Sequence, residues 1–140
     1  MKTILTGLVT FGACNAARWY LDRSSRKDET IAGGRVRLTA LWNEKGAFGL
    51  PIPKELLLSL GGAALGTLWT QRRRSPVAAG LILGGGLSNF AERLRRGKVY
   101  DYVQFPKAPG KLKRYVFNLA DFAILAGGAD FMMSESCRRK

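Results

Sequence analysis

Apolar runs alternate with densely basic stretches along the sequence, and this alternation restricts the folds that the chain can adopt. The apolar runs cover residues 4–21, 56–70, 77–90 and 115–133. A helix that crosses a bilayer needs about 20 mostly apolar residues, and the two middle runs reach that length only if their polar flanks join the helix. We therefore predict an all-α membrane protein, in which residues 1–140 form a single domain with four transmembrane helices.

Glycines in the two middle runs favour close packing of helices inside lipid. They are Gly61, Gly62 and Gly66 in one run and Gly80, Gly84, Gly85 and Gly86 in the other. Each glycine costs a soluble helix about 1 kcal/mol relative to alanine, whereas small residues allow membrane helices to approach one another closely. We interpret these glycines as packing positions and not as sites of chemistry.

Two shorter segments outside these runs predict a small β element. Residues 34–42 alternate loosely and are rich in Val, Leu, Thr and Trp, and residues 98–105 contain Val, Tyr and Phe in a similar pattern. Such residues favour strands, and Tyr and Trp are enriched where a membrane meets water. We expect the two segments to pair into a small sheet at one face of the membrane.

The balance of charges indicates a negatively charged partner. The chain has 23 Lys and Arg against 10 Asp and Glu, a net charge of +13, which suits either anionic lipid head groups or nucleic acid. The basic residues bracket the apolar runs and do not form one surface, so we favour lipid head groups. A basic nucleic-acid-binding protein is the alternative, and solubility without detergent would distinguish the two.

The residue types that are missing narrow the possible chemistry. The sequence contains no histidine, which excludes Ser-His and Cys-His catalysis and zinc sites built on histidine. Its two cysteines, Cys14 and Cys137, make no metal cluster and no evident disulfide framework. We therefore expect no metal site, and carboxylates become the candidates for catalysis.

Several polar residues lie in or beside the apolar runs, where burying a polar side chain in lipid costs free energy. An ionisable group at membrane depth is expensive unless it is paired or hydrated, so it is a candidate functional residue. Asn118 and Asp121 are three residues apart and share a helical face. The other candidates are Asn89, Glu92, Arg93, Asp101 and Asp130.

Asp101 and Asp121 could supply acid and base catalysis without histidine. Two carboxylates that meet in a poorly hydrated site cannot both ionise easily, so one keeps a proton. The ionised carboxylate can activate water, and the protonated one can protonate a carbonyl oxygen or a leaving amine. An aspartic hydrolase is then the simplest enzyme that the sequence could encode. The alternative is that Asp121 and Asn118 only bridge helices.

Four short blocks occur in an order that is specific to one protein family. GGGLSNFAERLRRGKVYDYV, residues 84–103, is similar to a block of glycines, then Asn, two residues, an acidic residue and Arg, then Gly-x-Val and a first catalytic Asp. FNLADFAI, residues 117–124, is similar to the FNxADxxI block that carries the family's second catalytic Asp. NEKGAFG, residues 43–49, and WYLDR, residues 19–23, are similar to an element of the outer face and to the end of the first helix. Together the blocks resemble the lipoprotein signal peptidases (signal peptidase II).

The resemblance implies a role for each matching residue. Asp101 and Asp121 would be the catalytic dyad of an aspartic-type signal peptidase. The residues that position the dyad and the substrate backbone would be Asn89, Arg93 and Asn118, and those that support the site would be Asn43 and Asp22. Glu92 stands where the family usually has Asp, and would be a longer carboxylate in the same pairing role.

The resemblance also implies the activity and its setting. The substrate would be a prolipoprotein whose lipobox cysteine carries a diacylglyceryl group, and the enzyme would cut before that cysteine to release the signal peptide. The family is bacterial, needs no metal or organic cofactor, and is a multi-pass protein of the cytoplasmic (inner) membrane with its site near the outer face, which makes the β element extracytoplasmic. We expect a monomer that contacts membrane lipids and no nucleic acid.

Three positions depart from the family pattern. Ser88 replaces a usual Gly, Glu92 replaces Asp, and Lys45 stands where a small residue is expected. These differences leave open a non-catalytic membrane protein that binds lipidated segments and in which both aspartates are dispensable. Because both aspartates are present, we favour the active enzyme.

Overall fold

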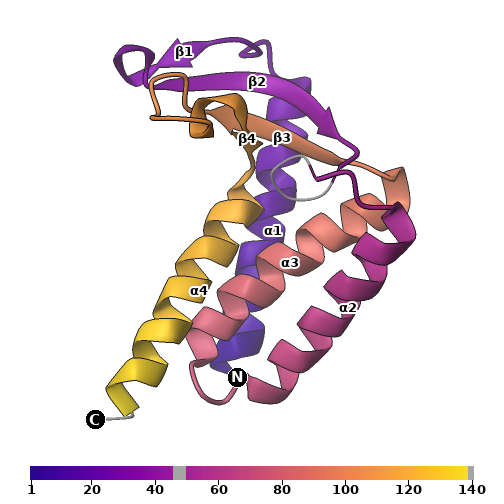
Figure 1. The fold of residues 1–140 in the computed structure, drawn as a ribbon, viewed down its shortest axis with the longest axis vertical. Coiled ribbons are helices and arrows are strands. Elements are labelled where there is room, and N and C mark those ends of the chain that lie inside the picture. Colours follow the sequence, from indigo (N-terminus) through magenta and orange to yellow (C-terminus); the bar gives the residue numbers. More distant parts are fainter. Residues whose placement is uncertain (46–49, 139–140) are drawn as a thin grey trace.

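Four helices and one small sheet make up the part of the chain that the structure describes, residues 1–45 and 50–138 (Figure 1). The computed structural model places the helices at α1 (Lys2–Arg23), α2 (Lys54–Gln71), α3 (Pro76–Arg96) and α4 (Leu119–Arg138). The strands are β1 (Thr30–Ile31), β2 (Val36–Asn43), β3 (Val99–Gln104) and β4 (Val116–Phe117), and two 3₁₀ turns are η1 (Ala32–Gly34) and η3 (Leu112–Arg114). The strands pair antiparallel in the order β1-β2-β3-β4.

The sheet lies across one end of the helices, while the N-terminus, the last turn of α4 and the turn between α2 and α3 lie at the other end (Figure 1). The helices and the β2–β3 pair confirm the elements expected from the sequence. α3 continues past its expected end at residue 90 as far as Arg96, and the left-handed backbone of Gly97 (φ 75°) stops it there. α4 begins later than expected because β4 first pairs with β3. Four transmembrane helices are expected from the sequence, whereas no helix among the described residues is both long and apolar enough to cross a membrane.

α3 lies in the middle of the bundle and contacts each of the other helices. Glycines permit this packing: a Cβ atom on Gly84 would lie 2.5 Å from the carbonyl oxygen of Gly7 in α1, and one on Gly85 would lie 2.7 Å from that of Ala120 in α4. These distances are too short for a side chain, which confirms the packing role predicted for both glycines. In α2, by contrast, a Cβ on Gly66 would meet no described atom within 4 Å.

Apolar side chains lie on the outside of α1, and small or polar ones lie inside. The buried residues of this helix are Thr3, Thr10, Cys14 and Arg18. Its large aliphatic residues Ile4, Leu5, Leu8 and Val9 are each more than half exposed. The inner face of α1 therefore gives the bundle a polar interior next to α3, and the outer face gives it an apolar surface.

Candidate active site

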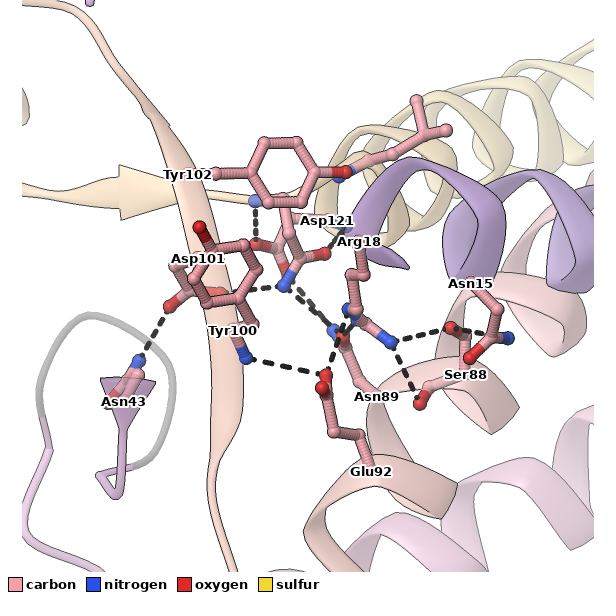
Figure 2. Close-up of polar contacts among 12 residues, drawn as sticks. Asn15, Arg18, Asn43, Ser88, Asn89, Glu92, Tyr100, Asp101, Tyr102 and Asp121 are labelled. Atoms are coloured by element: carbon pink, nitrogen blue, oxygen red, sulfur yellow. Dashed lines mark hydrogen bonds and ion pairs between the residues drawn. The ribbon is translucent and has the colours of Figure 1, made fainter. Parts of the chain in front are cut away.

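A buried polar cluster lies where α1, α3 and the first turn of α4 meet strand β3 (Figure 2). Dashed lines in the figure join its side chains into one network although their segments are far apart in the sequence. The members of the cluster are Arg18, Asn43, Asn89, Glu92, Asp101, Asn118 and Asp121. All of them except Arg18 are site residues expected from the sequence, so the fold brings most of the expected site together.

The first turn of α4 holds Asp121 through two reciprocal hydrogen bonds. The backbone N–H of Asn118 donates to Asp121 Oδ2 (2.9 Å), and the backbone N–H of Asp121 donates to Asn118 Oδ1 (3.1 Å). This is the arrangement of a capping box, in which the residue before a helix and its third residue satisfy each other's backbone groups. The local sequence Asn-Leu-Ala-Asp therefore both starts the helix and fixes the Asp121 carboxylate.

Asn118 also connects Asp121 to Asp101, which lies on β3. Its Nδ2 donates to Asp101 Oδ1 at 2.7 Å, and only 1% of Asn118 and 3% of Asp101 are exposed. At the end of β2, Asn43 donates from Nδ2 to Asp101 Oδ2 at 3.0 Å. Antiparallel pairing of β2 with β3 brings Asn43 to this position, so each oxygen of Asp101 has an amide donor.

The surroundings of Asp101 raise the pKa of its carboxyl group toward neutral pH. Burial raises the pKa of Asp101 to about 6, and the nearby charge of Asp121 adds to the rise. Hydrogen bonds from Asn118 and Asn43 and the positive charge of Arg93 lower the pKa and limit the rise. Asp101 is therefore a carboxyl group that can change its protonation state close to the pH at which enzymes work.

Asn89 on α3 orients the other carboxylate. Its Nδ2 donates to Asp121 Oδ1 at 3.0 Å, and its Oδ1 accepts from Asn118 Nδ2 at 3.2 Å. Asp121 therefore receives a hydrogen bond on each oxygen, one from Asn89 and one from the Asn118 backbone. As both carboxylates are held at both oxygens, the direction in which each one faces is fixed.

Arg93 lies beside the cluster and holds the loop that follows β2. Its Nη2 donates to the backbone carbonyl of Lys45 at 3.1 Å, and the backbone N–H of Lys45 donates to Asn43 Oδ1 at 2.9 Å. Lys45 makes both contacts through its backbone, so its larger side chain is compatible with this arrangement. The rest of the expected Ala-Phe-Gly element, residues 46–49, lies outside the described residues.

Two other acidic candidates lie away from the pair of aspartates. Asp22 lines a cavity of about 490 Å³ together with Tyr100, and the described walls of this cavity include neither aspartate of the pair. The separation follows from the alternation of a strand, because Tyr100 and its neighbour Asp101 point to opposite faces of β3. Asp130 accepts a hydrogen bond from Ser75 Oγ (3.1 Å) at the start of α3, the end far from the sheet.

Arg18 is a member of the cluster that the motifs did not identify. Only 5% of this residue is exposed, and its guanidinium contacts Asn89 and Glu92 on α3. The sequence contains a signal for it, because Arg18 is one helical turn from Cys14 and two from Thr10, on the same face of α1. That face carries small and polar residues within an apolar run, and it is the face that the structure buries.

The cluster is suited to moving protons. Its two carboxylates are bridged by the Asn118 side chain and backbone, so one can be ionised while the other is protonated, as acid and base catalysis requires. Among the described residues, no group of three or more metal-ligating side chains is placed to hold a metal ion.

Comparisons with known proteins agree on one family. The family described as signal peptidase (SPase) II matches residues 8–137. A lipoprotein signal peptidase from Nitrobacter hamburgensis is 36% identical over 67% of this chain and 68% of its own length, and one from Chlorobium luteolum is 34% identical over 75% and 71%. One from Methylobacterium sp. (strain 4-46) is 29% identical over 95% of this chain and 90% of its own.

The fold is shared with solved membrane enzymes, whereas the family rests on the sequence matches. A solved bacterial membrane enzyme superposes with a TM-score of 0.81 at 17% identity, over 97% of this chain and 87% of that one. A second has a TM-score of 0.77 over 94% and 89%. The chain therefore belongs to the signal peptidase II family of proteases.

Proposed function

We propose that this chain is an aspartic endopeptidase that removes the signal peptides of diacylglyceryl-modified prolipoproteins, with Asp101 and Asp121 as its catalytic pair. The observation that carries the proposal is the bridge made by Asn118, which is hydrogen-bonded to both aspartates inside a buried cluster. The relatives named lipoprotein signal peptidases supply the class of substrate.

The pair works with one proton. The ionised aspartate takes a proton from water as the water oxygen attacks the scissile carbonyl carbon, and the protonated aspartate donates its proton to the carbonyl oxygen. When the tetrahedral intermediate collapses, the C–N bond breaks and the amine of the lipidated cysteine takes up the proton that came from water. The hydroxyl proton returns to the other aspartate, so the pair again holds one proton. The products are the free signal peptide and a lipoprotein that begins at the modified cysteine.

The other cluster residues hold the pair in this geometry. Asn89 and Asn118 direct N–H groups at the carboxylates, and fixed dipoles of this kind favour one orientation throughout the reaction. Arg93 and Asn43 hold the backbone of Lys45, directly after β2, and we assign Arg93 to the substrate backbone.

Glu92 acts indirectly, because it ties α3 to α1 through Arg18 and to β3 through the Tyr100 N–H. Asp22 supports the end of α1, where it forms an ion pair with Lys27 at 3.9 Å.

We further infer that the helices cross the bacterial cytoplasmic membrane, with the sheet and the aspartate pair near the outer face. The apolar outer surface of α1 suits contact with lipid tails. The basic turn 72–74, which lies at the end of the bundle away from the sheet, favours a cytoplasmic position for that end. Extraction of the protein from membranes by alkaline carbonate, without detergent, would contradict this placement.

Purified protein in detergent is expected to cleave a diacylglyceryl-modified prolipoprotein immediately before the modified cysteine. The matched control is the same prolipoprotein before lipid transfer, which should remain uncut. Mass spectrometry of both products locates the cut and distinguishes signal-peptide removal from general proteolysis. Cleavage of neither substrate, or of both at equal rates, would show that the proposed activity is wrong.

Replacing Asn43 with alanine is expected to move the pH dependence of kcat/KM. Because burial raises the pKa of Asp101 to about 6, the pair loses its last proton above that pH and the wild-type rate should fall. The Asn43 hydrogen bond lowers this pKa, so the falling limb should shift to higher pH in Asn43→Ala. The control is Gln104→Ala on β3, the strand of Asp101, because the Gln104 side chain donates to the Lys113 carbonyl and not to either aspartate. A limb that stays in place, or moves to lower pH, would refute this explanation.

A further inference from the structure

Arg18 is a buried cation between α1 and α3. Its Nη1 donates to Ser88 Oγ at 2.8 Å and to the Ser88 carbonyl oxygen at 3.2 Å, and its Nη2 donates to Asn89 Oδ1. Its Nε forms an ion pair with Glu92 Oε2 at 2.9 Å, with 6% and 10% of the two side chains exposed. Both Nη atoms of the guanidinium thus donate hydrogen bonds to α3, whereas Nε lies beside the Glu92 carboxylate as an ion pair, without the alignment of a hydrogen bond (Figure 2).

The contact with Arg18 determines which way the Asn89 amide faces. A guanidinium has only N–H donors and no acceptor, so the Asn89 atom beside it must be the carbonyl oxygen Oδ1. The amide Nδ2 then faces Asp121 and donates to its Oδ1 at 3.0 Å. In a flipped amide, Nδ2 would meet the Arg18 donors and Oδ1 would meet a carboxylate, so both contacts would become repulsive.

The other partner of the Asn89 oxygen could not enforce this orientation equally well. Asn118 Nδ2 lies 3.2 Å from Asn89 Oδ1, but it also donates to Asp101 Oδ1 at the shorter distance of 2.7 Å. A hydrogen bond from a charged donor is roughly twice as strong as one between neutral groups. Arg18 is therefore the stronger of the two donors that hold the Asn89 oxygen.

Two departures from the family pattern are explained by the same contact. Ser88 and Glu92 both lie against Arg18, one as a hydrogen-bond acceptor and the other as the neutralising carboxylate. Glu92 also accepts from the backbone N–H of Tyr100 at 3.3 Å, which ties α3 to β3. A buried arginine without partners is strongly unfavourable, so Ser88 and Glu92 supply what Arg18 needs at this depth.

We propose that Arg18 is a positioning residue for proteolysis, which acts by fixing the Asn89 amide so that it donates to Asp121. The proposal rests on the proposed function of the aspartate pair. Arg18 itself does not touch the reacting atoms. Its removal should therefore slow the chemical step and leave substrate binding nearly unchanged.

The test uses the double variant Arg18→Met/Glu92→Gln. Arg18→Met alone would leave Glu92 as a buried unpaired charge, whereas glutamine at position 92 removes the charge and can still accept from the Tyr100 N–H. We expect this variant to fold, with kcat lowered by about 10- to 100-fold and KM little changed. The matched control is Arg23→Met, which removes the same charge from the same helix at an exposed guanidinium stacked on Trp19, and should cleave like the wild type.

The same double substitution in a protein that lacks the Asn89 side chain distinguishes a role in positioning Asn89 from a general structural role of Arg18. In an Asn89→Ala protein there is no amide to orient, so adding the Arg18→Met/Glu92→Gln pair should lower kcat little further. The proposal would be overturned if the double substitution lowered kcat by the same factor in the wild-type and the Asn89→Ala backgrounds, or if it lowered kcat in neither. Both outcomes are read in a preparation whose wild type cleaves the lipidated substrate. If the wild type does not cleave that substrate, the proposed function fails first, and the role of Arg18 in proteolysis fails with it.

Discussion

Asp101→Asn and Asp121→Asn are each expected to lower kcat by about 10²- to 10⁴-fold, the usual contribution of a positioned acid or base. Asparagine has nearly the shape of aspartate, but it can neither take up nor deliver the proton that the reaction moves. At position 101 it would keep an oxygen for the Asn118 amide, now at 2.7 Å. At position 121 it would keep one for the Asn118 backbone, now at 2.9 Å. The cluster should therefore still form, and the loss should appear in kcat with KM little changed.

The matched control for these variants is Asp130→Asn. Asp130 lies on α4 like Asp121, but it accepts from Ser75 at the opposite end of the helix, so the same loss of a carboxylate should leave cleavage unaffected. Thermal unfolding in detergent is measured in parallel, because Asp121→Asn also removes a negative charge from the first turn of α4, where such a charge stabilises a helix by about 0.3–1 kcal/mol. If both aspartate variants fold and cleave as fast as the wild type, the carboxylates are dispensable, and a non-catalytic protein that binds lipidated segments becomes the better explanation.

The helices could be located from the sequence because each needs a continuous apolar stretch, and only four such stretches exist. The residues at which the helices begin and end could not be predicted as well. α4 starts after β4, a strand of only two residues whose partner β3 lies in a different part of the chain. A segment that short has no periodicity of its own, so its pairing with β3 could not be inferred from local pattern.

The site shows the same division between local and distant contacts. The spacing of Asn118 and Asp121 is local, and it places both in one capping box. The contact of Asn43 with Asp101 depends on the register of β2 and β3, which motif order alone does not determine. Arg18 is separated from its Ser88 partner by 70 residues, so only the polar stripe on α1 pointed to its burial.

The spacing between α1 and α3 controls whether these distant contacts can form, and Gly84 determines that spacing. Its added Cβ would lie 2.5 Å from the Gly7 carbonyl oxygen and 2.7 Å from Thr10 Cβ. Because the first of these is a backbone atom, it cannot rotate away. An alanine at position 84 must therefore push α1 off α3, in the direction that also draws Arg18 away from Asn89.

Gly84→Ala is accordingly expected to destabilise the protein by about 1–3 kcal/mol, as overpacking in a close-packed interior does, and to lower cleavage as well. Thermal unfolding in detergent and the cleavage rate give the two readouts. Gly66→Ala is the matched control, because a Cβ there meets no described atom within 4 Å and alanine favours a helix by up to about 1 kcal/mol relative to glycine. A Gly84→Ala protein that unfolds no earlier than Gly66→Ala would show that the helices can separate at no cost, and that contact between α1 and α3 does not set the geometry of the site.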